Sequence, residues 1–202
     1  MWNEFYAWAA RLAPEKWAVM CCGIGIAVVA GIYIASPLLQ GLYQRWQIRG
    51  RIRRLGDEVI EGARIPDGMG RALCIDYLVR NQAGVTVVAV RRYPGVIFAA
   101  ENMELWVQVL KNGSHKFPNP LPELRMQVAA VKALVPDVPV TGVLLFAQGS
   151  RFPKGKPGEV LTLDELPPTA CPQATGSMPG VEQGWERLRI QNNELATGET
   201  CS

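Results

Sequence analysis

Clustered cations are the first feature of this sequence that could do chemistry. Residues 148–158 (QGSRFPKGKPG) form a basic loop rich in glycine and proline, which is well suited to contact phosphate groups. Against this interpretation, the net charge is only +3, and a run of charge is more often a solvated face. The candidate nucleic-acid-binding residues are Arg91, Arg92, Lys111, Lys116, Arg151, Lys154 and Lys156, with further cations at His115 and between Arg45 and Arg54.

Cysteine and histidine are too few and too scattered to indicate a zinc site. The five cysteines are an odd number without CxxC spacing, and His115 is the single histidine. This pattern argues against both a disulfide framework and a structural zinc site. We therefore expect no cofactor from these residues.

A long uncharged stretch near the N-terminus predicts a membrane anchor. Residues 17–39 contain no charged residue, and a helix needs about 20 apolar residues to cross the hydrocarbon core. The length of this stretch and the acidic Glu4 and Glu15 before it disfavour a cleaved signal peptide. A core helix that is apolar on every face would need a larger protein around it. The sequence therefore predicts a single transmembrane helix over residues 17–39, after an extracytoplasmic segment of residues 1–16.

The charges on the two sides of this stretch predict its orientation. Before it, Arg11 and Lys16 are offset by two glutamates, whereas five arginines follow it closely. Because Lys and Arg are retained on the cytoplasmic side, we expect a bacterial inner-membrane protein with a periplasmic N-terminus and a cytoplasmic C-terminal domain. Residues 40–55 then form a basic juxtamembrane helix that contacts lipid headgroups.

Small residues recur every four positions inside the predicted span. Such a stripe lets a second helix approach closely, which predicts self-association or pairing with another membrane protein. The alternative is that glycine and alanine are simply common in membrane helices. The stripe consists of Gly23, Ala27, Gly31 and Ala35.

In the rest of the chain, strands come first and a helix follows. Residues 72–80 and 85–92 are rich in β-formers, and residues 81–84 join them as a hairpin. After residue 168, prolines predict a tail with little fixed structure, except for a short helix over residues 181–195 that would dock through Val181, Trp185, Leu188 and Leu195. The other expected elements are strands at 96–98, 101–110, 140–147 and 159–163, and a helix over 121–134.

Four short segments follow one another before a helix and a strand: residues 74–79 (CIDYLV), 87–95 (VVAVRRYPG), 104–106 (ELW) and 119–121 (NPL). In this order the residues resemble the nuclease-related domain (NERD) group of the PD-(D/E)xK nuclease-like superfamily, over residues 56–166. The resemblance implies a restriction-endonuclease-like α/β (α+β) domain with a central mixed β-sheet over residues 56–168, followed by the tail of residues 169–202.

The resemblance also implies an active-site pattern, from which this sequence departs. In such nucleases an Asp and a Glu hold Mg²⁺, and a Lys two positions after the Glu helps to activate or orient the attacking water. Asp76 matches the Asp, but Ala89 replaces the Glu and supplies no ligand. Arg91 replaces the Lys and cannot give up its proton as a lysine can. We therefore expect a vestigial site in which Asp76 is at best a weak metal ligand, and Mg²⁺ only if the nuclease is active.

Other carboxylates near these positions leave alternatives open. Glu123 stands where the family has a Gln at its helix start, and Glu58 is an uncertain match to a glutamate of the family's first helix. Glu101, Glu104 or Glu123 could replace the missing ligand, although no spacing singles one out. Asp76 could instead form a salt bridge with Arg91.

These observations predict a membrane-tethered protein whose inactive nuclease-related domain binds DNA or acts as a scaffold. One alternative is a structural subunit of a membrane-embedded conjugation or secretion machine that acts through protein contacts. Another is an active Mg²⁺-dependent nuclease with a migrated carboxylate. The expected partners are membrane lipid, DNA and other membrane-protein subunits, or the chain itself through its transmembrane helix.

Overall fold

The computed structural model describes residues 32, 41, 43, 45–68, 70–147, 149–166 and 180–196. The predicted span of residues 17–39 and its small-residue stripe therefore lie outside the described residues, apart from the helical Ile32. Within the described part of the chain, no helix is long and apolar enough to cross a membrane. The chain forms two compact units, and the second, Trp46–Ser202, contains the folded domain.

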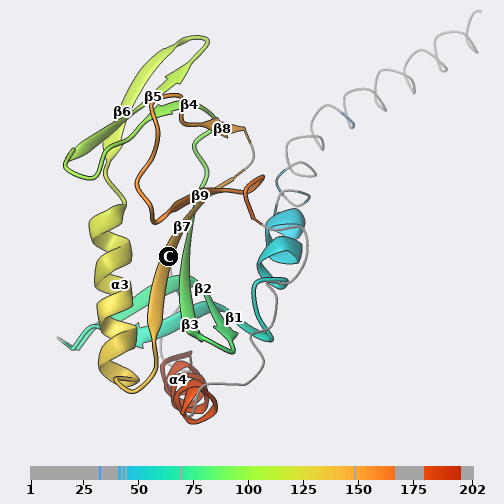
Figure 1. Ribbon diagram of the computed structural model, residues 1–202, viewed down its shortest axis with the longest axis vertical. Helices are drawn as coiled ribbons and strands as arrows, with labels where there is room; N and C mark the ends of the chain where they lie inside the picture. The colour runs from blue at the N-terminus through green and yellow to red at the C-terminus, as the bar shows by residue number, and fades with distance from the viewer. Residues whose placement is uncertain are drawn as a thin grey trace, which may run out of the picture. The chain divides into compact units, whose positions relative to one another are not determined.

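A mixed five-stranded sheet, here called the central sheet, organises this domain (Figure 1). Strands β1, β2 and β3 pair antiparallel, whereas β3, β7 and β9 run parallel. The expected α/β fold with a central mixed sheet is thus confirmed. In sheet order the strands are β1 (Glu58–Pro66), β2 (Ala72–Asn81), β3 (Gly84–Arg91), β7 (Val140–Phe146) and β9 (Val160–Thr162).

The expected hairpin between β2 and β3 is closed by a two-residue loop. The side chain of Asn81 accepts a hydrogen bond from the Ala83 N–H at 2.9 Å. Gly84 follows with φ of 144°, and a Cβ there would lie 2.2 Å from the Pro139 carbonyl oxygen. Only glycine therefore lets β3 begin this close to the segment that leads into β7.

A second, four-stranded sheet, here called the small sheet, lies at the top of Figure 1. The strand expected over residues 101–110 begins only at Leu105, because a turn occupies the residues before it. The sequence did not indicate β6, whose short polar segment includes His115 and Lys116. In sheet order the strands are β6 (Gly113–Pro118), β5 (Leu105–Leu110), β4 (Gly95–Phe98) and β8 (Ser150–Arg151).

Three helical segments cover the central sheet. Helix α3 (Leu121–Leu134) has the expected bounds, and α4 (Val181–Ala196) confirms the short helix expected after residue 180. Residues 45–52 are also helical, and Ile48 and Ile52 bury against the face of the sheet opposite to that of α3. The segment expected to contact lipid headgroups therefore also contributes to the protein core.

Helix α4 is held to β1 and β2 by polar as well as apolar contacts. The Trp185 indole N–H donates to the Glu58 carboxylate at 2.6 Å, and Arg80 forms ion pairs with Glu58 and with Glu182. At the other end of the helix, the Arg64 guanidinium donates to the Leu195 carbonyl oxygen at 3.1 Å. Of the expected docking residues, Val181, Trp185 and Leu188 are buried, and Leu195 is half-buried.

Cys74 of β2 is disulfide-bonded. The sequence argument was against a disulfide framework, whereas this bond concerns a single cysteine of the described residues.

Trp185 should contribute strongly to stability. Trp185→Ala removes a buried indole and its bond to Glu58, so the free energy of unfolding of the full chain in uncharged detergent should fall by about 3–5 kcal/mol. Urea unfolding followed by circular dichroism measures this change. Ile190→Ala on the exposed side of the same helix is the matched control and should change it by no more than about 0.5 kcal/mol. Equal losses in both variants would show that α4 does not dock as described.

Candidate functional site

Asp76 lies where β2 bends away from β3. The last bridged pair of these two strands is Tyr77 with Val88. The next β3 amide that faces β2, that of Val90, therefore lacks a backbone partner on β2. The Asp76 carboxylate accepts this N–H at 2.7 Å. Asp76 therefore supplies the hydrogen bond that the β2 backbone no longer provides.

The bend also appears in the burial of the flanking residues. Ile75 and Leu78 are three positions apart, yet both bury in the same apolar cluster, which regular alternation along a strand does not allow. On β1, the residue opposite Asp76 is Gly62, with a positive φ of 61°. This irregular pair of positions leaves the Asp76 side chain exposed at the edge of the core.

Arg91 lies between two carboxylates that come from different elements. Its Nη1 is 3.5 Å from Asp76 Oδ2, and its Nη2 is 2.6 Å from Oε2 of Glu123 in the first turn of α3. The Arg91 side chain is only 20% exposed. The ion pair between Asp76 and Arg91, left open as an alternative by the sequence, is present, and the contact with Glu123 adds a second partner.

The residues at this site do not fit a Mg²⁺ ion. Mg²⁺ in proteins is usually held by one or two carboxylates with octahedral geometry. Ala89 is buried in the core and offers no oxygen, and the guanidinium of Arg91 is bonded to both nearby carboxylates. Among the residues that the structure describes, no three or more His, Cys, Asp or Glu side chains form a group that could hold a metal ion.

The other carboxylates considered from the sequence are placed differently. Glu101 is ion-paired with Arg125, whereas Glu104 is exposed on the loop before β5. Glu58 lies on β1 rather than in a first helix, and it forms an ion pair with Arg80 of β2. Arg80 is four residues along β2 from Asp76, which separates Glu58 from the Asp76 site by about 13 Å.

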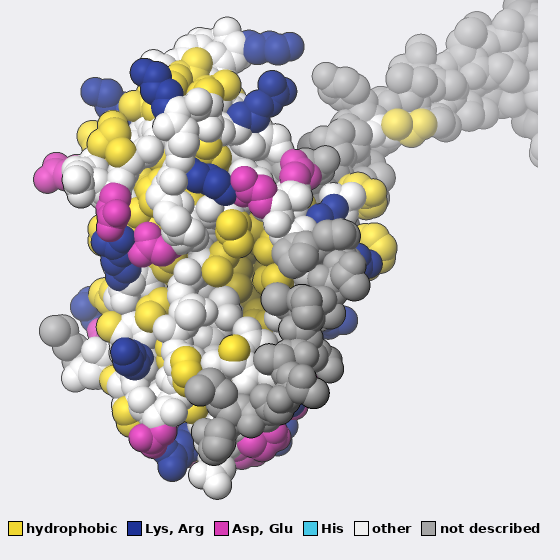
Figure 2. Space-filling model, in the orientation of Figure 1, with side chains coloured by type: hydrophobic (Ala, Val, Ile, Leu, Met, Phe, Trp, Pro, Cys, Tyr) yellow, Lys and Arg dark blue, Asp and Glu magenta, His cyan; other side chains and the backbone are white. Residues whose placement is uncertain are grey.

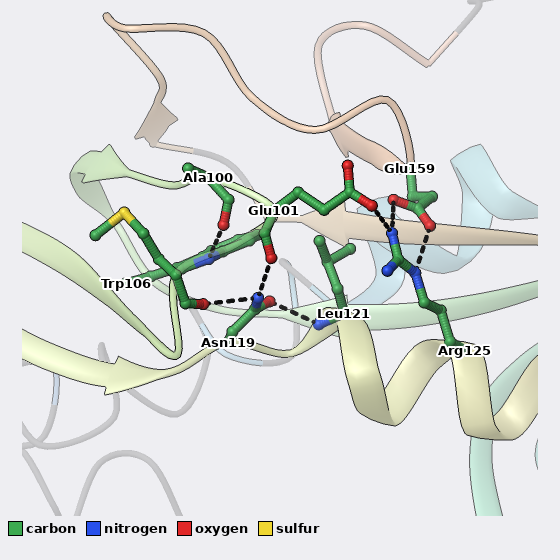
Figure 3. Close-up of polar contacts among 8 residues, drawn as sticks. Ala100, Glu101, Trp106, Asn119, Leu121, Arg125 and Glu159 are labelled. Atoms are coloured by element: carbon green, nitrogen blue, oxygen red, sulfur yellow. Dashed lines mark hydrogen bonds and ion pairs between the residues drawn. The ribbon is translucent and has the colours of Figure 1, made fainter.

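The start of α3 is fixed by the side chain of Asn119 (Figure 3). Its amide nitrogen donates to the carbonyl oxygens of Glu101 and Met103, and its oxygen accepts the Leu121 N–H at 2.9 Å. The Trp106 indole donates to the Ala100 carbonyl oxygen in the same loop. These bonds hold the loop between β4 and β5 against the helix start that presents Glu123.

Arg125, one turn further along α3, links the same loop to the segment before β9 (Figure 3). It donates twice to the Glu159 carboxylate, at 2.9 and 3.1 Å, and once to that of Glu101. Hydrogen bonds to Glu159 and then to Glu101 raise the pKa of the Arg125 guanidinium above its ordinary value. The sequence did not indicate this contact, because its partners are 24 and 34 residues away from Arg125.

Comparison with known families agrees with this fold. The chain matches the nuclease-related domain over residues 40–147, which is more than half of its length. It belongs to the NERD family. No curated protein and no solved structure matches the chain. The expected resemblance is thus confirmed, and the matched part contains β1 to β7 and α3 but not α4.

The candidate nucleic-acid-binding residues of this NERD domain divide into two groups. Arg91 is ion-paired with Asp76 and Glu123, and Lys156 is ion-paired with Glu165. The hydrogen bond from Lys156 lowers the pKa of Glu165, and the hydrogen bond from the Thr162 N–H lowers it further. Within the described part of the chain, four of the other candidates form no ion pair, and Lys154 lies over the ring of Phe98 at 5.4 Å from its centre. The four are Arg92, Lys111, Lys116 and Arg151.

Most of these available cations belong to the small sheet or its turns. Lys111 follows β5, Lys116 lies on β6, and Arg151 lies on β8. The four strands of the small sheet contain no Asp or Glu. Figure 2 shows Lys and Arg side chains gathered over this sheet at the top of the view, among hydrophobic ones.

The cations before β1 have other partners. Arg49 and Arg53 form ion pairs with Glu61, and the hydrogen bond to Glu61 raises the pKa of Arg49. Arg51 donates to the carbonyl oxygens of Leu163 and Leu166. These three arginines therefore help to attach the segment before β1 to the domain.

Asp76 should stabilise the end of β3. Asp76→Ala leaves the Val90 N–H without its acceptor, so amides at the end of β3 should exchange faster in hydrogen–deuterium exchange. The expected loss of stability is about 1–3 kcal/mol. Asp76→Asn keeps an acceptor oxygen and should have a smaller effect. Glu104→Ala, an exposed carboxylate on the neighbouring loop, is the control, and equal protection of β3 in all three variants would contradict this role.

Proposed function

We propose that this chain is a membrane-tethered NERD protein whose domain binds nucleic acid without cutting it. The position of Arg91 between Asp76 and Glu123 carries the proposal. A guanidinium ion-pairs with both carboxylates and stays protonated, so it serves neither as a metal ligand nor as a proton acceptor. Binding does not need those functions.

The unpaired cations support a role in binding. Lys111, Lys116 and Arg151 form no ion pair within the described residues, and they surround a sheet without carboxylates. Such a surface favours nucleic-acid binding, because each contact between a cation and a phosphate releases counterions from the nucleic acid. The vestigial site itself is less suited to phosphate, since Asp76 and Glu123 lie beside its one guanidinium.

The proposed tether is the apolar stretch of residues 17–39, in a bacterial inner membrane. The five arginines after this stretch support a cytoplasmic domain. The disulfide of Cys74 would suit an oxidising compartment better. For the orientation of the chain we give the flanking charge more weight than the disulfide, because Lys and Arg beside an apolar stretch act directly on its insertion into the membrane.

A structural role in a membrane-embedded conjugation or secretion machine is the second candidate. Exposed apolar side chains on the small sheet favour it, since Leu105 and Val109 are 46% and 36% exposed. A protein partner bound through such side chains would be insensitive to salt and would co-purify with the chain. Pairing through Gly23, Ala27, Gly31 and Ala35 would add a contact within the membrane.

A combined cleavage and binding assay tests the proposal. The full chain in uncharged detergent should leave plasmid and oligonucleotides intact with Mg²⁺ or Mn²⁺, yet bind DNA in EDTA with an affinity that falls steeply as salt rises. Lys111→Ala with Lys116→Ala should weaken binding and reduce the salt slope by about 2. Lys132→Ala with Arg187→Ala removes the same charge from the two helices and should change neither.

Two results would contradict the proposal. Divalent-dependent cleavage that Asp76→Asn abolishes would establish an active nuclease, with Glu123 as the first carboxylate to examine. Absence of both cleavage and salt-sensitive binding would leave the structural role.

A further inference from the structure

The small sheet has one buried face and one outer face whose side chains are exposed or half-buried. Ile97, Trp106 and Phe117 are buried in the core on the inner side. Because side chains alternate along strands, the residues between them point outward. The resulting outer face consists of Val96, Phe98, Leu105, Val107, Val109, Ser114, Lys116, Pro118 and Arg151.

Strand register gives this outer face an apolar centre with cations at its sides. Val107 pairs with Phe98 on one side and with Lys116 on the other. Val96 pairs with Val109 on one side and, on the other, with Arg151 of the edge strand β8. The charged side chains on the outer face are all positive, and Lys154 over the Phe98 ring adds another cation.

A duplex is a poor match for such a face. Its outside presents phosphates and sugars, while the faces of its bases are hidden in the stack, so it would leave the apolar centre uncovered. The bases of a single strand have free faces that lie against aromatic and apolar side chains, while its phosphates reach nearby cations.

We infer that the outer face binds single-stranded nucleic acid, an inference that rests on the nucleic-acid binding proposed above. Bases lie against Phe98, Val107 and Val109, and phosphates contact Lys116, Arg151 and Lys154. The Lys154 ammonium lies over the Phe98 ring, 5.4 Å from its centre, so this cation is within reach of the phosphate of a base that packs against Phe98 beside it.

An anionic lipid surface would also combine apolar and cationic contacts. Insertion into lipid, however, buries apolar side chains about 5–10 Å deep, and this requires side chains that project from the surface. Leu105 and Val109 are the more exposed apolar side chains on the outer face, whereas Phe98 and Val107 in the middle of the sheet are half-buried between their neighbours. This central pair offers a base a flat support rather than an anchor that penetrates a membrane.

Fluorescence anisotropy with a labelled single strand and the duplex of the same sequence tests the inference. The full chain in uncharged detergent and EDTA should bind the single strand at least about 10-fold more tightly. Phe98→Ala should weaken single-strand binding by roughly 10-fold and leave duplex binding unchanged. Phe98→Leu keeps most of the apolar volume and therefore controls for loss of folding. It should also weaken binding of the single strand and leave duplex binding unchanged.

Cation variants separate this inference from the proposal on which it rests. The double variant Lys116→Ala with Arg151→Ala should weaken binding of both the single strand and the duplex. The control double variant Lys132→Ala with Arg187→Ala should change neither affinity. Equal affinity for the two ligands, or normal single-strand binding by both Phe98 variants, overturns the single-strand inference and leaves nucleic-acid binding intact. No binding of either ligand overturns both. If the chain then binds phosphatidylglycerol micelles, and Lys116→Ala with Arg151→Ala weakens that binding, the outer face is a lipid-binding surface.

Discussion

The hydrogen bond from the Val90 amide to the Asp76 carboxylate is the contact around which this NERD domain is arranged. Strand β3 is central, antiparallel to β2 and parallel to β7, so its amides need partners on both sides. Where β2 bends away, a side chain takes over from the backbone. The bond keeps β3 extended as far as Arg91, which brings the guanidinium within reach of Glu123 on α3.

Under the proposed function, this arrangement lets a nuclease-related fold persist without a metal site. The carboxylate that the family uses as a metal ligand has a structural partner here, and a second carboxylate at the helix start also pairs with Arg91. The site is therefore held together by ion pairs, with two carboxylates for one guanidinium. The available positive charge lies instead on the small sheet, where binding would leave the core undisturbed.

Much of this fold was predictable from local sequence signals, because helix α3 and strands β3 and β7 have strong periodicity and clear turn residues. Strand β6 was missed because its polar residues gain partners only by pairing with β5, and β1 because Gly62 interrupts its alternation. The contact between Asp76 and Arg91 was foreseen, as an alternative, from residue types. The contacts of Arg91 with Glu123 and of Arg125 with Glu159 span more than 30 residues, which no spacing rule reports.

The central claim is that Arg91 takes the place of a metal ion between Asp76 and Glu123. Calorimetric titration of the full chain with Mg²⁺ and Mn²⁺ tests it most directly, with Asp76→Asn and Arg91→Ala beside the wild type. We expect no saturable binding to the wild type, and weak binding at most when Arg91→Ala releases the two carboxylates. Stoichiometric binding to the wild type that Asp76→Asn abolishes would contradict the claim.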